Sequence, residues 1–204
     1  GLGDVYKRQD LRDPSHAADM VSRVVSEMGR LDVCVANSGL YPPEPRPMWE
    51  IGNKRWESTV MSNLSVTANT ARAFLSHPSE EGAGSLVLVG STAGIYGEAG
   101  HSDYAAAKGA ITTGLLLSLK NEVSRIGSVR VNAVAPGWTM TPKKVESGLD
   151  EDIAERAKST MALKKLATPE DVASAIVILS SDEVSGHITG QVIEVSGGME
   201  GRLV

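Results

Sequence analysis

The sequence predicts an α/β fold in which helices cover a parallel β-sheet. From Asp10 onward, short and almost continuous apolar runs alternate with amphipathic stretches at helical spacing. This is the pattern of a buried parallel sheet whose strands are joined by helices. Only 4% of the 204 residues are aromatic, whereas 41% are hydrophobic and 21 residues are glycine. We therefore expect a core of Ala, Val, Ile and Leu with many close backbone contacts.

Local signals define the first helix and the first strand. The segment at residues 13–15, Asp-Pro-Ser, predicts a helix start, because proline suits the first turn and either neighbour can cap it. Apolar residues then recur at helical spacing until Gly29, a usual residue just beyond a helix end. The run at residues 31–36 predicts a strand buried on both faces. Residues 41–47 hold four of the nine prolines and are predicted to form a loop.

The later elements continue this alternation. Helices are predicted at residues 53–76, 103–126, 150–161 and 168–179. Strands are predicted at residues 85–90, 129–134 and 191–195, with irregular connections at 94–100 and 138–150. The helix at 103–126 is rich in Ala and Leu on more than one side, so more than the sheet is expected to cover it. The sequence contains no internal repeat or interdomain linker, and a single domain is predicted.

Composition narrows the class of protein and of partner. A net charge of -5 without a block of Lys or Arg argues against nucleic acid or an anionic membrane surface as a partner. The apolar runs are too short to span a bilayer. The single cysteine, Cys34, can form no internal disulfide, which favours a reducing, cytoplasmic location. The four histidines share no metal-ligand spacing, so we expect them at ordinary surface positions and expect no metal site.

Residues 1–9 are predicted to be a non-native segment. They form a polar stretch without strand alternation, and no start methionine precedes them. The stretch from Asp4 to Gln9 can be back-translated as GATGTGTATAAGAGACAG, which resembles the end of a transposon adapter used in preparing DNA sequencing libraries. A natural loop of the same sequence is the alternative. We exclude the segment from the predicted fold, as one would exclude a cloning scar.

Tyr104 and Lys108 form the first candidate for chemistry. They lie four residues apart in a predicted helix, and therefore one turn apart on the same face. A tyrosine is a poor base at neutral pH unless a nearby cation stabilises its phenolate. The pair predicts acid–base chemistry, although a core tyrosine and a solvated lysine would also explain this spacing on its own.

Further polar or small residues gather where predicted strands end. Ligands bind at the carboxyl ends of the strands in a parallel α/β sheet. The residues that follow three of the strands are Asn37-Ser38-Gly39, Ser91 and Pro136-Gly137. Each of these segments alone is explained by an ordinary turn. Asn63 is a polar amide inside a predicted helix, which is unfavourable unless the amide bonds the backbone, solvent or a partner.

These residues together resemble the short-chain dehydrogenase/reductase family over residues 10–199. The family's catalytic tetrad matches Asn63, Ser91, Tyr104 and Lys108. The cofactor-binding positions match Asp10-Leu11, Asn37-Ser38-Gly39 with Ser in place of the usual Ala, Tyr104, Lys108, Pro136, Gly137, Thr139 and Thr141. The resemblance implies a Rossmann-type doubly wound parallel sheet and NAD or NADP as the cofactor.

The resemblance also implies a role for each catalytic residue. Tyr104 donates a proton to a substrate carbonyl as hydride arrives from the nicotinamide, or removes one from an alcohol in the reverse direction. Lys108 lowers the pKa of Tyr104 and bonds the nicotinamide ribose. Ser91 hydrogen-bonds the substrate oxygen, and Asn63 orders a water that links Lys108 to solvent. The substrate is expected to be a small alcohol or ketone, and the intact enzyme a homodimer or homotetramer.

The family's glycine-rich turn and the residue that selects NAD or NADP have no counterpart in the sequence. The resemblance therefore implies that the first β-α-β units are missing and that residues 10–204 are the C-terminal part of a single domain. The strand at 31–36 would then be an apolar edge. We expect the 204-residue chain by itself neither to bind a dinucleotide tightly nor to reduce a carbonyl. Micromolar binding of NAD(P)H in a titration would contradict this expectation.

Two other interpretations stay open at this point. One is an inactive fragment, and the other is a non-catalytic module that binds dinucleotide or mediates oligomerisation through the helices at 53–76 and 103–126. A cofactor-dependent change in absorbance separates an enzyme from both. Residues 142–165 match the family's variable substrate lid. Four large residues near the strand ends can line an apolar pocket or simply pack in the core: Tyr41, Tyr96, Trp138 and Met140.

Overall fold

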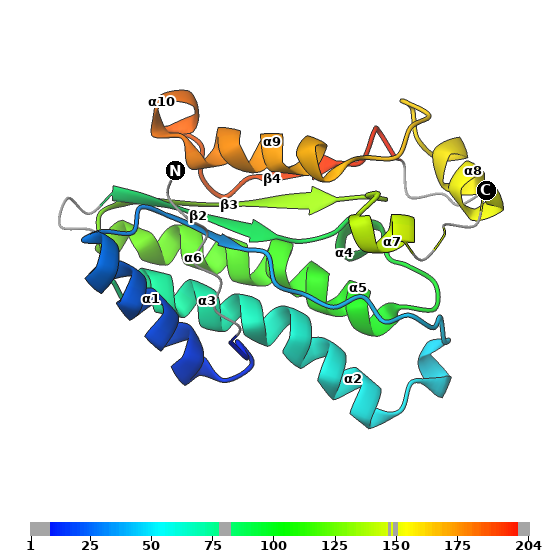
Figure 1. Ribbon diagram of the computed structural model, residues 1–204, viewed down its shortest axis with the longest axis horizontal. Coiled ribbons are helices and arrows are strands. Elements are labelled where there is room, and N and C mark those ends of the chain that lie inside the picture. Colours follow the sequence, from blue (N-terminus) through cyan, green and yellow to red (C-terminus); the bar gives the residue numbers. More distant parts are fainter. Residues whose placement is uncertain (1–8, 78–82, 147, 149–150, 200–204) are drawn as a thin grey trace.

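Four parallel strands form the sheet at the centre of the protein (Figure 1). The structure is a computed structural model that describes residues 9–77, 83–146, 148 and 151–199. The strands pair in chain order, and they are β1 (Val33–Ala36), β2 (Ala83–Val89), β3 (Ser128–Pro136) and β4 (Val192–Val195). The predicted α/β class and its parallel sheet are confirmed, with small shifts at the strand ends.

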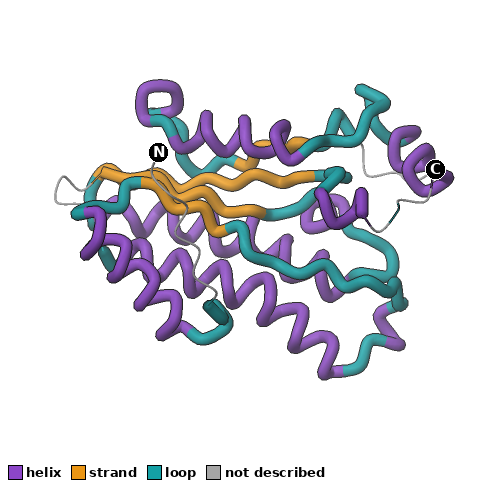
Figure 2. Tube along the Cα trace, in the orientation of Figure 1, coloured by secondary structure: helices purple, strands orange, loops and turns teal. Residues whose placement is uncertain are grey.

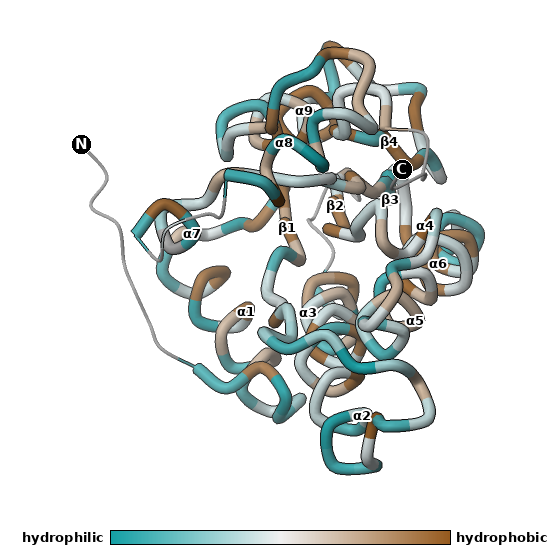
Figure 3. Tube along the Cα trace, turned by 90° about the vertical axis from the view of Figure 1, so that its right-hand side faces the viewer, coloured by the Kyte–Doolittle hydropathy of each residue, from teal (hydrophilic) through white to brown (hydrophobic). Residues whose placement is uncertain are grey.

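Helices cover both faces of the sheet, as in a doubly wound fold (Figures 1 and 3). On one face, α3 (Val66–Leu75) packs against β1 and β2, and α6 (Leu116–Glu122) packs against β3. The first helix, α1 (Pro14–Met28), packs against α3. On the opposite face, α9 (Pro169–Ser180) packs against β2, β3 and β4. The central strands therefore lie between two helical layers.

Aliphatic side chains fill the space between the sheet and each layer. Leu86 and Leu88 of β2 are fully buried on the side of α3 and α6. Val87 of β2 and Val134 of β3 are fully buried on the other side, against Leu179 of α9. Successive side chains of a strand point to opposite faces, so β2 and β3 contribute to both cores.

The strand β1 is buried on one face only, so the prediction of burial on both faces is wrong. Cys34 and Ala36 are buried, whereas Val33 is 39% exposed and Val35 is 38% exposed. The physical reason is the position of α9, which packs against the other three strands. As expected from the resemblance, β1 lies at an edge of the sheet.

The predicted boundaries of α1 and α9 are confirmed. The Asp13 carboxylate accepts a hydrogen bond from the backbone N–H of Ser15 at 2.8 Å, and Gly29 ends α1 with a φ of 82°. Thr168 and Asp171 form a reciprocal capping box at the start of α9. These contacts are local in sequence, which is why the sequence alone predicts them.

Each of the two long predicted helices is interrupted by a π-helical turn. The first helix consists of α2 (Asn53–Val60), the π turn η2 (Met61–Ser65) and α3. The second consists of α5 (Ser102–Gly109), the π turn η3 (Ala110–Leu115), α6 and the 3-10 turn η4 (Val123–Arg125). A π turn inside an α-helix is rare and often lies at a functional site.

Short helices occupy segments that the sequence predicts to be irregular. These are α4 (Ala93–Tyr96), after β2, and α7 (Pro142–Glu146), within the predicted connection at 138–150. The turn η1 (Met48–Glu50) and the helix α10 (Asp182–Ser185) are also additional to the prediction. A single turn is too short for a periodic apolar pattern. The helix predicted at 150–161 corresponds to α8 (Glu151–Ser159), with residue 150 outside the described residues.

The predicted non-native segment, residues 1–9, lies outside the described residues except for Gln9. No helix in the described part of the chain is long and apolar enough to cross a membrane. Within the same part of the chain, no group of three or more His, Cys, Asp or Glu side chains is arranged to hold a metal ion.

Candidate active site

The carboxyl ends of β2 and β3 are joined by backbone hydrogen bonds next to Ser91. Gly90 N donates to the carbonyl of Val134 at 2.8 Å, and Thr92 N donates to the carbonyl of Pro136 at 3.0 Å. These bonds hold the segment that follows β2 against the end of β3. Ser91 therefore lies at the edge of the sheet where parallel α/β folds bind ligands.

Tyr104, in α5, lies close enough to Ser91 for the Ser91 hydroxyl to lower its pKa. The Ser91 Oγ also accepts a hydrogen bond from the backbone N–H of Ala93 at 3.2 Å, which helps to orient it. Burial raises the pKa of Tyr104, and the charge of Glu98 adds to the rise, while the Ser91 hydroxyl lowers it. The net rise keeps Tyr104 as a neutral phenol at physiological pH, able to donate a proton.

Lys108 lies one turn after Tyr104 on the same helix. Its Nζ is 5.8 Å from the centroid of the Tyr104 ring and donates a hydrogen bond to the carbonyl of Val89 at 2.9 Å. Lys108 is only 3% exposed, and this burial lowers its pKa to about 8. The structure brings the two side chains together, but burial raises the pKa of Tyr104. The lowering of that pKa by Lys108 therefore stays a prediction.

Asn63 lies within the π turn η2 and is completely buried. Its Nδ2 donates to the carbonyls of Leu40 and Thr59, both at 2.9 Å, and its Oδ1 accepts from the N–H of Leu40 at 3.2 Å. These bonds account for a polar amide in the middle of a helix. They also fix the chain just after β1. The role of Asn63 in ordering a water stays a prediction.

Gly39 brings Asn63 and Lys108 into one cluster. A Cβ atom on Gly39 would lie 2.8 Å from Asn63 Oδ1 and 3.3 Å from Lys108 Nζ. Only a residue without a side chain can come this close to both groups. Gly39 therefore lies directly against two members of the predicted tetrad, and the approach of a ligand to this strand end stays a prediction.

We expect Gly39→Ala to lower the stability of the protein by about 1–3 kcal/mol, because the added methyl group would press on a buried, hydrogen-bonded amide. Urea unfolding measures the change as a lower midpoint at unchanged slope. Gly114→Ala is the matched control, since a Cβ there has nothing within 4 Å and the residue is helical. If the Gly39→Ala protein is as stable as the Gly114→Ala protein, the expected steric clash between the added methyl group and Asn63 is contradicted.

A second glycine contact, which the sequence analysis missed, holds α4 against α5. A Cβ on Gly94 would lie 2.5 Å from the backbone N of Gly109, and a Cβ on Gly109 would lie 2.9 Å from the carbonyl oxygen of Gly94. The two backbones therefore touch directly. This contact sets the distance between the segment with Ser91 and the helix with Tyr104. Its partners are separated in sequence, so no local pattern reveals it.

The residues predicted to hold the nicotinamide end lie after β3. Gly137 passes close to the segment after β4, since a Cβ there would be 3.2 Å from Ser196 Cα. The Thr139 hydroxyl donates to the Gly137 carbonyl at 3.1 Å. Thr141 lies at the start of α7, where its carbonyl accepts from Lys144 N at 2.9 Å. The structure thus keeps this segment together at the carboxyl end of β3, which ends at Pro136.

The other predicted cofactor residues have different surroundings. Asn37 and Ser38 are exposed directly after β1. Asp10 lies just before α1, where hydrogen bonds from Arg12, one of them 2.6 Å long, lower its pKa to about 2. Leu11 packs against the core of α1. The Leu11 carbonyl also accepts a hydrogen bond from Asn69 Nδ2 of α3 at 3.0 Å. The role of Asp10 and Leu11 in binding the cofactor stays a prediction.

A cluster of three side chains, Tyr41, Glu98 and His101, borders Tyr104. The Tyr41 hydroxyl donates to the Glu98 carboxylate, and the Tyr41 ring stacks on His101 with centroids 4.5 Å apart. The same ring meets Tyr104 edge-on at 5.1 Å. His101 is only 5% exposed, so its predicted surface position is wrong. Its burial arises from contacts with residues about sixty positions away, which sequence spacing does not reveal.

Trp138 and Tyr96, two of the predicted pocket residues, contact charged side chains. Lys144 Nζ lies 5.0 Å from the centroid of the Trp138 ring, a cation–π contact. Burial lowers the pKa of Lys144. The Tyr96 hydroxyl donates to Glu194 at 2.8 Å. Each of these aromatic side chains therefore already contacts a charged group of the protein, Trp138 beside α7 and Tyr96 at the end of α4.

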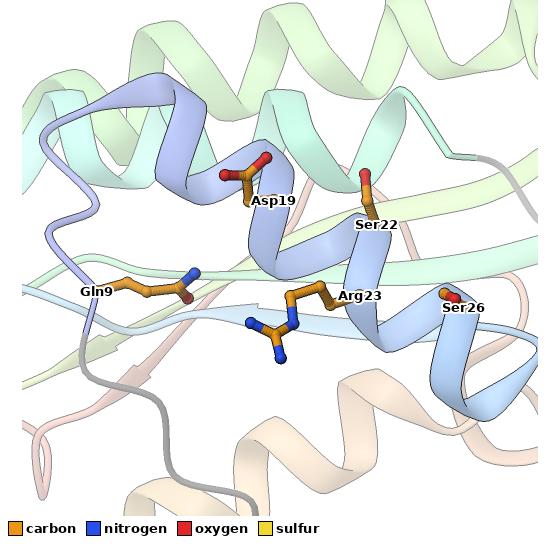
Figure 4. A pocket seen from close by; sticks show the side chains of 5 residues that line it. All are labelled: Gln9, Asp19, Ser22, Arg23 and Ser26. Carbon is orange, nitrogen blue, oxygen red and sulfur yellow. The ribbon is translucent and has the colours of Figure 1, made fainter.

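Three cavities in the described part of the chain differ in their distance from the tetrad residues, and one of them, of about 440 Å³, lies at the end of β4 beside Ser196. A cavity of about 470 Å³ runs along α1 and is lined by Gln9, Asp19, Ser22, Arg23 and Ser26 (Figure 4). It contains none of the predicted site residues. A cavity of about 340 Å³ borders Leu40, Arg55 and Thr59 and so adjoins the hydrogen-bond partners of Asn63.

Comparison with protein families gives a match over almost the whole chain. Residues 2–200 match the family model described as enoyl-(acyl carrier protein) reductase. A cis-4-hydroxycyclohexanecarboxylate dehydrogenase from Sinomonas cyclohexanicum is 35% identical over 195 residues, which cover 95% of this chain and 76% of that protein. A 3-oxoacyl-(acyl-carrier-protein) reductase from Thermotoga maritima is 34% identical over 190 residues, covering 93% of this chain and 74% of that protein.

A solved structure has the same arrangement of elements. It is a crystal structure described as a putative short-chain alcohol dehydrogenase from Sinorhizobium meliloti, with a TM-score of 0.85 and 27% sequence identity. The match covers 94% of this chain and 74% of that chain. The chain thus spans about three quarters of the length of these relatives.

Proposed function

Because the chain belongs to the short-chain dehydrogenase/reductase family of oxidoreductases, we propose that it interconverts a carbonyl group and a secondary alcohol by hydride transfer, with Tyr104 as acid and base. The observation that carries the proposal is the closeness of Tyr104 to Ser91, beside the buried Lys108. Two hydroxyl groups this close can both reach one substrate oxygen, which favours proton donation to a polarised carbonyl.

Each of the four side chains of the predicted tetrad has a proposed role in the reaction. In the reducing direction, Ser91 donates a hydrogen bond to the substrate oxygen and Tyr104 gives that oxygen its proton. Lys108, which is positively charged below its pKa of about 8, stabilises the phenolate that remains. Asn63 holds the chain at Leu40 in place beside Lys108 and orders the water that returns the proton. In the oxidising direction the same proton moves the other way.

NAD or NADP is the proposed cofactor, and it supplies or accepts the hydride when bound. The residues present fit such a group at the carboxyl ends of the strands, where Lys108 supplies a buried ammonium donor beside the hydroxyl-bearing Tyr104. The residues proposed to hold the nicotinamide end are Gly39, Tyr104, Lys108, Pro136, Gly137, Thr139 and Thr141. Asn37, Ser38, Asp10 and Leu11 are proposed to contact the rest of the dinucleotide.

A small alcohol or ketone is the proposed substrate. The names of the two relatives support this class, since one describes a hydroxy compound and the other a 3-oxo compound. Tyr41 is in edge-on contact with Tyr104 and is proposed to form one wall of the substrate pocket. Trp138 and Met140 are proposed to form another wall.

We also propose that residues 10–204 are the C-terminal part of a longer domain of this family. The absence of a glycine-rich turn from the sequence and the coverage of about three quarters of the relatives support this. The half-exposed Val33 and Val35 on the edge strand β1 are consistent with further strands beside it. Below, the extended chain means residues 10–204 preceded by the upstream coding sequence of the gene.

Activity of the extended chain tests the proposal. The measurement is the absorbance of the reduced nicotinamide during incubation with NADH or NADPH and a panel of small ketones. A decrease that depends on both the ketone and the cofactor supports the carbonyl reductase. If every ketone and every secondary alcohol leaves the absorbance unchanged, the non-catalytic alternative is favoured.

The rate of carbonyl reduction is expected to fall as the pH rises through about 8. Tyr104 stays protonated at that pH, because burial raises its pKa. Lys108 has a lowered pKa, so it carries its charge below about 8 and loses it above. The measurement is kcat/KM of the extended chain against pH. A profile that stays flat well above the pKa of Lys108 would contradict the proposed role of its charge.

We propose that the extended chain forms a homodimer or homotetramer in the cytoplasm. The sequence carries one cysteine, which fits a reducing compartment. Met61 in η2 and Leu117 in α6 are 41% and 44% exposed, and both lie on the long helices proposed as the interface. Light scattering measures the assembly, and a monomer at micromolar concentration would exclude it.

A further inference from the structure

A buried ion pair joins α2 to α5 next to the proposed acid. Arg55 Nε donates to Asp103 Oδ2 at 2.9 Å, and Arg55 Nη2 donates to Asp103 Oδ1 at 3.3 Å. The Asp103 side chain is completely buried and the Arg55 side chain is 20% exposed. A two-point contact between guanidinium and carboxylate fixes orientation as well as distance. Neither residue belongs to the predicted tetrad.

Arg55 also binds the two loops that border Tyr104. Its Nη1 donates to the carbonyl of Glu44 at 2.7 Å, in the proline-rich loop after β1. Its Nη2 lies 3.4 Å from the carbonyl of Gly100, in the loop before α5. The same Gly100 carbonyl accepts from the N–H of Arg46 at 2.8 Å. Arg55 thus ties the loop after β1 to the loop before α5; Figure 2 shows both in teal.

Asp103 connects the other side of the pair to two tetrad residues. It directly precedes Tyr104 and is hydrogen-bonded to the Tyr104 backbone. It also accepts a hydrogen bond from the buried Thr59 hydroxyl at 2.9 Å, and the Thr59 carbonyl accepts one from Asn63 Nδ2 at 2.9 Å. A continuous path of short contacts therefore runs from the backbone of Tyr104 to the side chain of Asn63.

The Asp103 carboxylate is charged in this position. Burial raises its pKa, but hydrogen bonds from Arg55 and Thr59 outweigh the burial and bring the pKa below its usual value. Replacing a buried ion pair with apolar residues of similar volume is often neutral or stabilising. Stability alone therefore does not explain a charged pair here, whereas a requirement for fixed orientation does.

We propose that Arg55 and Asp103 are positioning residues, which act through Thr59 and the α5 backbone to hold Tyr104 in register with Ser91 and Asn63. The proposal rests on the proposed function, because it assigns the pair to the group that transfers the proton. The pair touches neither the tetrad hydroxyls nor the substrate oxygen directly. Its effect is on geometry, and a misplacement of about 1 Å lowers the rate of a positioned reaction up to about 100-fold.

The first readout is the ¹³Cζ chemical shift of Tyr104 in the 204-residue chain at neutral pH, which reports the surroundings of the phenol hydroxyl, including the nearby Ser91 hydroxyl. Labelled tyrosine supplies the signal, Tyr104→Phe assigns it, and Ser91→Ala gives the shift of a phenol without the Ser91 hydroxyl beside it. Arg55→Gln, Asp103→Asn and Thr59→Val are expected to move the signal toward the Ser91→Ala value. Thr59→Ser, which keeps the hydroxyl donor, is expected to retain the wild-type shift.

Arg130→Gln is the matched control. Arg130 is also a buried arginine paired with an aspartate, Asp182, but it lies in β3 and contacts the end of α9. This variant is expected to lose stability while the Tyr104 signal stays at the wild-type position. A signal that moves in Arg130→Gln as much as in Arg55→Gln would mean that any loss of stability disturbs Tyr104, and the proposal would fail.

The second readout is turnover of the extended chain. Thr59→Val and Arg55→Gln are expected to lower kcat about 10- to 100-fold with little change in KM, and Thr59→Ser is expected to restore kcat. If Asp103→Asn or Arg55→Gln does not fold, the two Thr59 variants decide, since both leave the charges in place. Unchanged kcat and an unchanged Tyr104 signal in folded Thr59→Val would overturn the inference.

The two proposals fail in different ways. If Tyr104→Phe keeps its turnover, the proposed function is wrong, whatever the variants of the ion pair do. If Tyr104→Phe is inactive while the folded Arg55 and Thr59 variants match the wild type in signal and in kcat, then only the positioning role is wrong.

Discussion

Tyr104→Phe is expected to abolish measurable turnover of the extended chain while leaving its fold intact. The phenyl ring keeps the edge-on contact with Tyr41, but it carries no proton to donate and no hydroxyl beside Ser91. Positioned acid–base catalysis contributes about 10²- to 10⁴-fold to a rate. The loss of kcat/KM is expected to lie in that range or beyond it, since Ser91 also loses the hydroxyl beside it.

The experiment compares initial rates of carbonyl reduction by Tyr104→Phe and by the wild type, with equal urea midpoints as proof of an intact fold. Thr113→Val is the matched control, because it removes a hydroxyl from the π turn η3, directly after α5, at an exposed position. It is expected to keep the wild-type rate. Turnover by Tyr104→Phe within about tenfold of the wild type would refute the assignment of Tyr104.

The fold is largely predictable from the sequence because its signals are local. Asp13 and Gly29 mark the two ends of α1 through contacts within a few residues. The strand β2 is a short apolar run, and β3 is rich in Val and Ala although it also carries the buried Arg130 and Asn132. The burial of β1 is not predictable in this way, because Val33 and Val35 look as apolar as their neighbours. Their exposure depends on where α9 packs.

The sequence predicts which residues belong to the candidate site, but it does not predict the contacts that hold them in place. The spacing of Tyr104 and Lys108 predicts one helical face, and the structure places Tyr104 next to Ser91 and Lys108 next to Tyr104. The Arg55–Asp103 pair could not be predicted, because its members are 48 residues apart. In addition, arginine and aspartate usually lie at the protein surface, so neither residue stands out in the sequence. The same holds for the contact of Gly94 with Gly109, which exists only once α4 is folded against α5.

The π turn η2 illustrates the limit of periodic patterns. A helical pattern predicts one continuous helix through residues 53–76, and Asn63 then looks like a defect within it. In the structure, both Nδ2 hydrogens and one lone pair of Oδ1 of Asn63 bond the backbone of Leu40 and Thr59, and the helix widens there into a π turn. The unfavourable residue is thus the signal of the site, as such local conflicts often are.

Arg130→Met is expected to lower the stability of the protein by about 3 kcal/mol. Arg130 is 6% exposed in β3, and its Nη1 donates to the carbonyl of Leu179 at 2.8 Å and to Ser185 Oγ at 3.1 Å. Its Nη2 lies 3.4 Å from the carbonyl of Ser180. Methionine keeps the alkyl part of the side chain but removes the guanidinium donors from the end of α9, where, among the described residues, the Leu179 carbonyl keeps only the Ser85 hydroxyl, at 3.0 Å. Urea unfolding at constant slope measures the loss.

Two comparisons separate the carbonyl contacts from the ion pair with Asp182. Asp182 is 81% exposed, so Asp182→Asn removes a charge that water already solvates and is expected to change stability by less than about 1 kcal/mol. Arg23→Met removes an arginine that is 57% exposed and 3.8 Å from Glu27, with an expected loss below about 0.5 kcal/mol. If Asp182→Asn costs as much as Arg130→Met, the ion pair rather than the carbonyls holds α9 to β3. If Arg130→Met is as mild as Arg23→Met, the end of α9 does not depend on Arg130.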